Sequence, residues 1–303
     1  MTPAITVVVP CYNGGRYLDR LRTSLDAQTF RDFEVVIVDD GSTDELTRDK
    51  LASLDGWAER TRVVRQSNRG LAGARNTGFR EAKAEFVLPL DCDDELDRTF
   101  LQRTWQLMRD AIPEVGFVFT HIRLAGARTG VRSCHFDVFD QLFVNDVLYC
   151  MLIRKSAWEA CGGYDETMRD GYEDWEFNIR LAKTGYRGLE LAEPLVTYWV
   201  NPDGMLHAVS LPRHAGLWRG IREKHAVLYR AGALWTASRT RDRKRVRISL
   251  LQGAALLCLA KLLPDRWYSA LFALTLSIRR KMTPKTVDQY GDGMELAGRP
   301  RRE

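Results

Sequence analysis

The first hundred residues alternate between β-branched apolar runs and stretches with helical hydrophobic spacing. Residues 5–9 and 34–38 are apolar without internal alternation, which is typical of parallel strands buried on both faces. Between them, leucines recur at spacings of three and four, which predicts a helix over residues 17–28. Pro10 has no amide proton for a sheet, so we expect it to end the first strand. This order predicts a βαβ unit.

The same alternation continues to about residue 120. The next predicted elements are a strand at 63–64, a helix at 72–82, a strand at 85–90, a helix at 98–110 and a strand at 116–120. Strands and helices in this order predict a largely parallel sheet with helices on both sides. Ligands bind such sheets beyond the carboxyl ends of the strands. Because Asn13, Asp39 and Asp91 each follow a predicted strand, we expect them to converge on one crevice.

The second half of the chain has a less regular pattern. Residues 147–153 predict another strand, and residues 172–184 predict a helix. Two apolar stretches near the C-terminus, 246–263 and 267–278, predict helices that Pro264 separates.

Composition indicates an ordinary globular protein with an asymmetric charge. The 303 residues are 45% hydrophobic and 28% charged, which excludes a disordered or fibrous chain. Residues 211–303 carry 20 Lys and Arg against 7 Asp and Glu, whereas residues 1–210 carry 25 against 33. We therefore predict one α/β domain over residues 1–210 and a basic helical tail over residues 211–303.

The basic tail favours an anionic partner. Its longest uncharged run, residues 248–260, has 13 residues, whereas a spanning helix needs about 20. Basic residues at 241–245 and 279–281 flank the apolar stretches, which fits helices that lie in the membrane interface. Packing against the domain as core helices is one alternative, and a solvated charged face is another. Nucleic acid is not expected as a partner, because the arginines are interleaved with aliphatic runs rather than with a stacking platform.

The cysteines and the N-terminus bear on the compartment. The six cysteines form no C-x-x-C pair and show no metal-ligand spacing with histidine, so we expect free thiols. The first apolar stretch is too short for a signal-peptide core and has no basic leader. We therefore expect a cytoplasmic protein that is peripheral on the inner face of the cell membrane.

An acidic cluster follows the strand predicted at 85–90. Asp91, Asp93 and Asp94 lie within four positions, so carboxylates two residues apart can reach one cation together. Mg²⁺ or Mn²⁺ is typically held by one or two carboxylates while phosphate oxygens complete its shell. Such a metal neutralises charge on a leaving diphosphate. Taken alone, the cluster is more typical of a helix cap or an Asx turn.

Six segments occur in order along the chain: VVVPCYNGG, VVIVDDGSTD, NRGLAGARNTG, FVLPLDCDD, CGGYDE and GYEDWEFNIRLA. Their order and spacing resemble the motif series of the family 2 inverting glycosyltransferases with the GT-A fold, over about residues 4–200. The resemblance implies a Rossmann-like, mostly parallel mixed sheet flanked by helices. It divides the α/β domain into a nucleotide-sugar-binding half, residues 1–97, and an acceptor and catalytic half, residues 98–210.

The resemblance also implies a set of nucleotide-binding positions. They are Pro10, Tyr12 and Asn13 in the pocket lining, Asp39 at the nucleobase, Asn68, Gly70 and Arg75 in the third segment, and Asp91 near the ribose. The nucleobase in this family is commonly uracil. Taken alone, Pro10 also fits a strand terminator, Asn13 a turn residue and Asp39 a helix N-cap.

The metal and the general base follow from the same resemblance. Asp93 and Asp94 match the contacts to Mn²⁺ or Mg²⁺ and to the diphosphate. Transfer with inversion is one displacement, so the acceptor hydroxyl must lose its proton to a base. Asp174 matches the acid of the family's E-D motif, and its place at a helix start would keep it ionised. A helix-capping acid is the alternative for Asp174.

The chain departs from the family after this helix. Where members often have Tyr-Arg-x-His, this chain has Tyr-Trp-Val-Asn ending at Asn201, and His207 follows six residues later. Either residue could contact the metal or the diphosphate, or neither. Four aromatic residues of the preceding segment could face a sugar or pack in the core: Trp158, Tyr164, Tyr172 and Trp175.

These observations predict an inverting transferase that moves a sugar from a nucleotide diphosphate, with UDP as the expected nucleotide, to a hydroxyl acceptor. The expected acceptor is a glycan or lipid-linked glycan of cell-surface polysaccharide or glycolipid synthesis, at the cytoplasmic membrane surface. The motifs of dinucleotide oxidoreductases and P-loop kinases are absent from the sequence, as is the Gly-rich basic loop of sugar-nucleotide pyrophosphorylases. A glycosidase with two carboxylates would not need the nucleotide loops. The alternative function is a catalytically silent carbohydrate- or nucleotide-binding module on the membrane surface.

Overall fold

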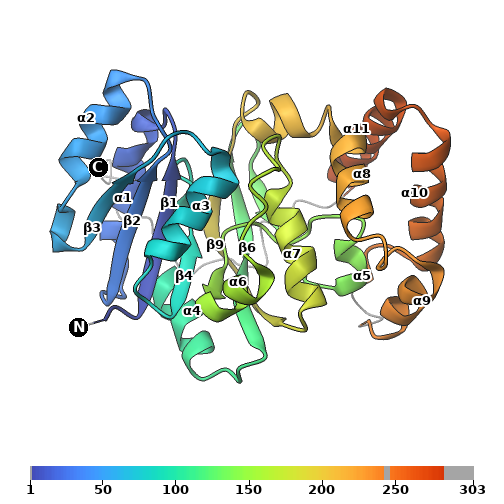
Figure 1. Ribbon diagram of the computed structural model, residues 1–303, viewed down its shortest axis with the longest axis horizontal. Coiled ribbons are helices and arrows are strands. Elements are labelled where there is room, and N and C mark those ends of the chain that lie inside the picture. The colour runs from blue at the N-terminus through green and yellow to red at the C-terminus, as the bar shows by residue number, and fades with distance from the viewer. Residues whose placement is uncertain (1, 242–245, 283–303) are drawn as a thin grey trace, which may run out of the picture.

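The computed structural model describes residues 2–241 and 246–282 and is built around one mixed sheet with helices on both faces (Figure 1). In the described residues the sheet has nine strands in the order β3-β2-β1-β4-β8-β6-β9-β5, with β7 beside β6. The strands are β1 Ile5–Cys11, β2 Phe33–Asp39, β3 Thr61–Arg65, β4 Phe86–Pro89, β5 Glu95–Leu96, β6 Val115–Gly126, β7 Gly130–Arg132, β8 Leu152–Arg154 and β9 Arg187–Val200. The predicted α/β fold with a mixed sheet is confirmed.

The predicted helices are present, with ends that differ by a few residues. The α-helices are α1 Leu18–Asp26, α2 Glu45–Leu54, α3 Gly70–Glu81, α4 Phe100–Arg109, α5 Val138–Gln141, α6 Lys155–Cys161, α7 Glu173–Lys183, α8 His214–Lys224, α9 Ala231–Arg239, α10 Leu250–Leu262 and α11 Asp265–Met282. Asp44 caps α2 by accepting a hydrogen bond from the Thr47 amide at 2.8 Å.

Pro10 lies inside β1 and does not end it, contrary to the prediction. The strand pairs in parallel with β2 as far as Cys11, which lies opposite Asp39. On its other side β1 pairs with β4 only as far as Val8. Pro10 therefore lies beyond the β4 ladder, where the amide proton that it lacks is not needed.

The second half of the sheet could not be predicted as well. The strand expected over residues 147–153 is confined to β8, which begins at Leu152 and pairs antiparallel with β4 and β6. The long strand β9 was not predicted, yet it runs parallel to β6 from Arg187 to Val200. Its register shifts twice between Thr120 and Ile122, which local sequence patterns do not reveal.

Two hydrophobic layers cover the sheet because successive strand residues face opposite sides. Val7 and Val9 pack in the layer that also contains Leu18 of α1. Val8 packs in the opposite layer with Phe79 of α3. Gly78 allows α3 to approach β1, since a Cβ atom at this position would lie 2.1 Å from Cγ1 of Val8.

The tail helices pack against the α/β domain through a third hydrophobic cluster. This cluster joins Trp175 of α7 to Trp218 of α8, Leu234 of α9 and Tyr268 of α11. Figure 1 shows α8, α9 and α11 at the end of the molecule opposite β3. The core-packing alternative therefore holds for these side chains, while other apolar side chains of the tail remain exposed.

Within residues 2–241 and 246–282, no helix has the length and the apolar character required to cross a membrane. Most of the basic segment 241–245 and all of residues 283–303 lie outside the described residues. All six cysteines are free, as expected.

Candidate active site

The carboxyl ends of β1, β2 and β4 open onto a cavity of about 490 Å³. Seven of the predicted site residues line this cavity: Pro10, Tyr12, Asn13, Asn68, Gly70, Asp91 and Asp93. They come from three segments that are distant in the sequence, and parallel strand order brings these segments to one edge of the sheet.

The loop after β1 is tied to the loop after β2. Asn13 has the left-handed backbone conformation, with φ of 50°, and its Oδ1 atom accepts hydrogen bonds from the amides of Thr43 and Asp44 at 2.8 and 3.3 Å. The Asn13 amide in turn donates to Oγ of Ser42 at 3.1 Å. Tyr12 beside it is 51% exposed, so its ring is available to a planar ligand group.

Asp40, rather than the predicted Asp39, lines the cavity. Asp39 is buried and its Oδ1 atom accepts a hydrogen bond from the Ser42 amide at 2.9 Å, so it shapes the turn. The Asp40 carboxylate accepts hydrogen bonds from the amides of Arg69 and Gly70, both at 2.8 Å. The two acids differ because neighbouring residues at a strand end point to opposite sides.

A second cavity, of about 250 Å³, adjoins the first. It shares Asp91, Asp93 and Asn201 with the first cavity, and the predicted base Asp174 also lines it. Asp91 and Asp93, which the resemblance places near the ribose and the diphosphate, therefore border the same continuous space as the predicted base Asp174.

Arg75 fixes two walls of this space. Its guanidinium is 1% exposed and contacts Oδ1 of Asp91 at 2.8 Å and Oε1 of Glu173 at 2.6 Å. Burial opposes the charged form, but the charges of Asp91 and Glu173 raise the pKa of Arg75. Arg75 thereby links the end of β4 to the start of α7 and lines the second cavity rather than the nucleotide-side cavity.

Asp174 is half-buried in the second cavity with both oxygens hydrogen-bonded. Nδ2 of Asn145 donates to Oδ2 at 2.9 Å, and the Trp175 amide donates to Oδ1 at 2.7 Å. The position of Asp174 at the helix start favours the ionised form. Burial acts in the opposite direction and raises the pKa of Asp174 above its ordinary value, which makes the carboxylate a stronger base.

Tyr172 turns the chain so that Glu173 and Asp174 meet the cavity. It has the left-handed conformation, with φ of 66°, which is unusual for a residue with a Cβ atom. Its hydroxyl lies 3.0 Å from Nδ1 of His214 in α8. The tail thus supports the conformation of the segment that carries Asp174.

Asp93 and Asp94 have different environments. Asp93 lines both cavities, and burial together with the Asp91 charge raises its pKa to about 6. Asp94 is 1% exposed and does not line either cavity. Its oxygens accept hydrogen bonds from the Tyr149 hydroxyl at 2.6 Å and from the Trp199 amide at 2.8 Å.

The donor set of the cavities suits a metal that a diphosphate helps to hold. No group of three His, Cys, Asp or Glu side chains in the described part of the chain is arranged to bind a metal alone. Asp91 and Asp93 offer two carboxylates, which fits Mg²⁺ or Mn²⁺ completed by phosphate oxygens. Asn201 lines both cavities beside them, whereas His207 is not among the lining residues.

The sequence did not identify several residues that line the cavities: Asp40, Arg132, Asn145, Tyr149, Tyr198 and Trp199. Most come from the irregular segment before β8 or from β9, where no local motif marks them. Of the aromatic residues considered for sugar contact, Trp158, Tyr164 and Trp175 pack in the core. Tyr172 alone among these four lines the second cavity.

Comparisons with known proteins find similarity to glycosyltransferases. The family model described as glycosyl transferase family 2 matches residues 6–135. The uncharacterized glycosyltransferase EpsJ of Bacillus subtilis is 36% identical over 231 residues, which cover 68% of this chain and 63% of that protein. Chondroitin synthase of Escherichia coli is 26% identical over 188 residues, 60% of this chain and 27% of that protein. The matches thus cover less than two thirds of these relatives.

Solved structures show the same fold. S. aureus TarS in complex with UDP-GlcNAc has a TM-score of 0.59 at 21% identity, covering 72% of this chain and 65% of that chain. The mannosyltransferase PcManGT of Pyrobaculum calidifontis, in complex with GDP-Man and Mn²⁺, has a TM-score of 0.54 at 23% identity, covering 92% and 81%. The family model thus marks residues 6–135 as a match to glycosyl transferase family 2, and the fold of the described residues is the GT-A fold of these solved glycosyltransferases.

Proposed function

We propose that this glycosyltransferase inverts the anomeric centre as it moves a sugar from a UDP-sugar to a hydroxyl acceptor. The observation that carries this proposal is the pair of adjoining cavities, which share Asp91 and Asp93 and have Asp174 on the far wall. The first cavity has room for the nucleotide, and the second for the sugar and the acceptor hydroxyl. A silent binding module would not need an acid on that far wall.

The nucleotide would occupy the larger cavity. Tyr12 offers an exposed ring to the nucleobase, and Asp40 holds the loop at Asn68 and Gly70 against it. UDP-GlcNAc is the ligand of the S. aureus TarS complex, which supports a uridine donor here. The GDP-Man complex of PcManGT makes GDP-sugars the comparison to test first.

Asp93 and Asp91, with Asn201 beside them, would hold a divalent cation together with the donor diphosphate. When bound, Mn²⁺ or Mg²⁺ neutralises the charge that develops on the leaving diphosphate. The Mn²⁺ in the PcManGT complex supports this assignment. Asp94 would support the site indirectly by holding Tyr149 and the backbone of Trp199.

Asp174 would act as the general base. The acceptor oxygen attacks the anomeric carbon from the side opposite the diphosphate, and the bond from that carbon to the phosphate oxygen breaks with its electron pair leaving on the diphosphate. The acceptor proton passes to Asp174. Asn145 holds the Asp174 carboxylate in place. Burial raises the pKa of Asp174, which makes its carboxylate a stronger base.

The first test is Asp174→Asn, which keeps the shape of the side chain and removes the base. We expect kcat to fall by about 10²- to 10⁴-fold, while the dissociation constant of UDP changes by less than about twofold. Steady-state transfer and calorimetric UDP binding measure the two quantities. Asp110→Asn is the matched control, because Asp110 is an exposed acid at the end of α4. Turnover by Asp174→Asn equal to that of the control would refute the role.

A second test separates Asp93 from Asp94 in the acidic cluster. Asp93→Asn should remove most of the Mn²⁺-dependent gain in UDP affinity, because it removes a cleft carboxylate. Asp94→Asn should instead lower the midpoint of thermal unfolding and leave the Mn²⁺ dependence in place, because Asp94 is buried with protein partners. Calorimetric titrations of UDP with Mn²⁺ and with chelator measure the first effect. If chelator changes neither the donor affinity nor the turnover of the wild type, the metal assignment is contradicted.

The membrane surface is the proposed location. Large apolar side chains of the tail are exposed, among them Leu251 at 83%, Leu262 at 78% and Trp267 at 59%. Together with the excess of Lys and Arg after residue 210, they fit helices that lie on the cytoplasmic face of the membrane. A lipid-linked or growing surface glycan is the acceptor that this location supports.

A further inference from the structure

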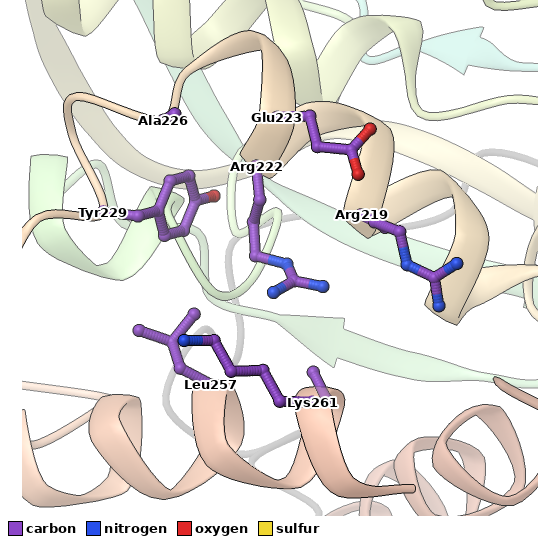
Figure 2. A pocket seen from close by; sticks show the side chains of 8 residues that line it. Arg219, Arg222, Glu223, Ala226, Tyr229, Leu257 and Lys261 are labelled. Carbon is purple, nitrogen blue, oxygen red and sulfur yellow. The ribbon is translucent and has the colours of Figure 1, made fainter. Parts of the chain in front are cut away.

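A separate cavity of about 550 Å³ lies between α8 and α10, in the tail (Figure 2). It shares no lining residue with the two cavities of the candidate active site. Its lining consists of Arg219, Arg222, Glu223, Ala226 and Tyr229 on one side and of Leu257, Ala260 and Lys261 on the other. The proposed sugar transfer gives this cavity no part.

Two cations that face the cavity form no ion pair among the described residues. Figure 2 shows Arg222 of α8 and Lys261 of α10 extending into the space between the helices from opposite sides. Among the described residues, neither side chain forms an ion pair or a hydrogen bond. The Nε atom of Arg222 is buried without a hydrogen-bond partner, and the guanidinium lies 4.5 Å from the centre of the Trp218 ring. Like charges in this arrangement favour an anion between them.

The other charged residues leave this preference intact. Arg219 forms an ion pair with Asp265 at the start of α11, so its charge is partly satisfied. Glu223 is the acid of the lining, and Figure 2 shows its carboxylate on the side of Arg222 that faces away from Lys261. Three cations and one carboxylate line the cavity, and burial lowers the pKa of Arg222 because the charged guanidinium is desolvated.

The rest of the lining is apolar, and α10 also carries exposed apolar side chains outside the cavity. Leu257, Ala260 and the ring of Tyr229 complete the wall, and the Tyr229 hydroxyl is already used in a hydrogen bond to the Leu142 carbonyl at 2.7 Å. On α10, Leu251 and Leu262 are among the most exposed large apolar side chains. A ligand that suits both features carries a phosphate group and a hydrocarbon part.

We propose that this cavity binds the phosphate headgroup of an anionic membrane lipid, with Arg222 and Lys261 as the phosphate contacts. The lipid's acyl chains would lie along the exposed side of α10. This inference rests on the proposed membrane location and is independent of the proposed sugar transfer. It assigns the tail a specific lipid site in addition to general attraction between basic residues and an acidic surface.

The test uses the full chain and dihexanoyl phosphatidic acid below its micelle concentration, titrated by calorimetry. Arg222→Gln with Lys261→Gln should weaken binding by at least about tenfold, because charge-assisted contacts are lost. The matched control, Arg239→Gln with Arg266→Gln, removes two exposed cations elsewhere in the tail and should change affinity by less than about twofold. Lys261→Glu, at an exposed helix position, should weaken binding further with little risk to folding.

Three outcomes would overturn the proposal. Equal losses in the cavity pair and the control pair would indicate general charge attraction. Displacement of the lipid by saturating UDP would place it in the nucleotide cavity. Inorganic phosphate binding as tightly as the lipid would identify a site for a free anion rather than a headgroup.

Co-sedimentation with phosphatidylglycerol vesicles distinguishes the proposed headgroup site from the proposed membrane location on which it rests. If the cavity pair binds vesicles as well as the wild type, the headgroup site falls and the membrane location stands. If the wild type binds no vesicles, both fall. Donor hydrolysis by the cavity pair should match the wild type, since neither residue lines the active-site cavities, and this readout reports on sugar transfer alone.

Discussion

At the scale of single residues, His214 connects the tail to the candidate base. It is 1% exposed and stacks against Trp175, Trp218 and Tyr268 with ring planes 10–12° apart. Its Nδ1 atom lies 3.0 Å from the hydroxyl of Tyr172, which precedes Glu173 and Asp174. Burial, assisted by the charge of Arg222, lowers the pKa of His214 to about 3.

This shift predicts a specific acid sensitivity. Below pH 6.5 the unfolded chain takes up a proton at His214 that the folded protein excludes, so the free energy of unfolding should fall as pH falls from about 6.5 toward 3. The contribution of His214 to this fall in the free energy of unfolding approaches about 1.4 kcal/mol per pH unit. Urea unfolding at pH 7.5 and pH 5.5 measures it.

Variants at the two ends of this hydrogen bond provide the controls. His214→Gln should lose the His214 contribution to the pH dependence, whatever it costs in stability at neutral pH. Tyr172→Phe should retain that contribution, because it removes the hydrogen bond and leaves the histidine buried. If the two variants depend on pH in the same way, His214 is not the source of the acid sensitivity.

At the scale of elements, the approach of α3 to β1 positions the charge at the centre of the site. Helix α3 carries Arg75, which reaches both Asp91 after β4 and Glu173 in α7. It also carries Asn76, whose Nδ2 atom donates to the Tyr164 carbonyl at 2.8 Å. The close packing at Gly78 sets how far these side chains extend toward the cavities.

Gly78→Ala tests this packing. The added methyl group would lie 2.1 Å from Cγ1 of Val8, so the helix must move or the strand must yield. We expect a loss of about 1–3 kcal/mol in the free energy of unfolding, typical of overpacking, with reduced turnover as α3 shifts. Gly220→Ala in α8 is the control, because nothing lies within 4 Å of a Cβ atom there and alanine favours the helix by up to about 1 kcal/mol. Equal stability of the two variants would contradict the account of α3.

At the scale of the whole molecule, local sequence patterns predicted those elements and loop positions that interactions between neighbouring residues determine. The βα repeats up to α4 and the convergence of Asn13 and Asp91 followed from buried runs and polar strand ends. The choice between Asp39 and Asp40 did not, because it depends on the direction in which each side chain leaves the strand. Asp94 is similar, since its partners Tyr149 and Trp199 come from distant segments.

The second half of the molecule depends on long-range pairing. Strand β9 pairs with β6 across about seventy residues of sequence, and it places Trp199 and Asn201 at the cavities. The packing of the tail against α7 through Trp218 likewise has no local motif. The site is therefore a property of the whole described structure, although its acids could be identified from the sequence.

The stereochemistry of donor cleavage tests the central claim most directly. Proton NMR can identify the sugar anomer first released when the protein hydrolyses, with Mn²⁺, the α-linked UDP-sugar that most stabilises it against heating. Attack from the side of Asp174 predicts that the β-anomer forms first, ahead of mutarotation, and that Asp174→Asn releases almost none. Initial release of the α-anomer, or release by Asp174→Asn at the wild-type rate, would contradict an inverting displacement with Asp174 as the base.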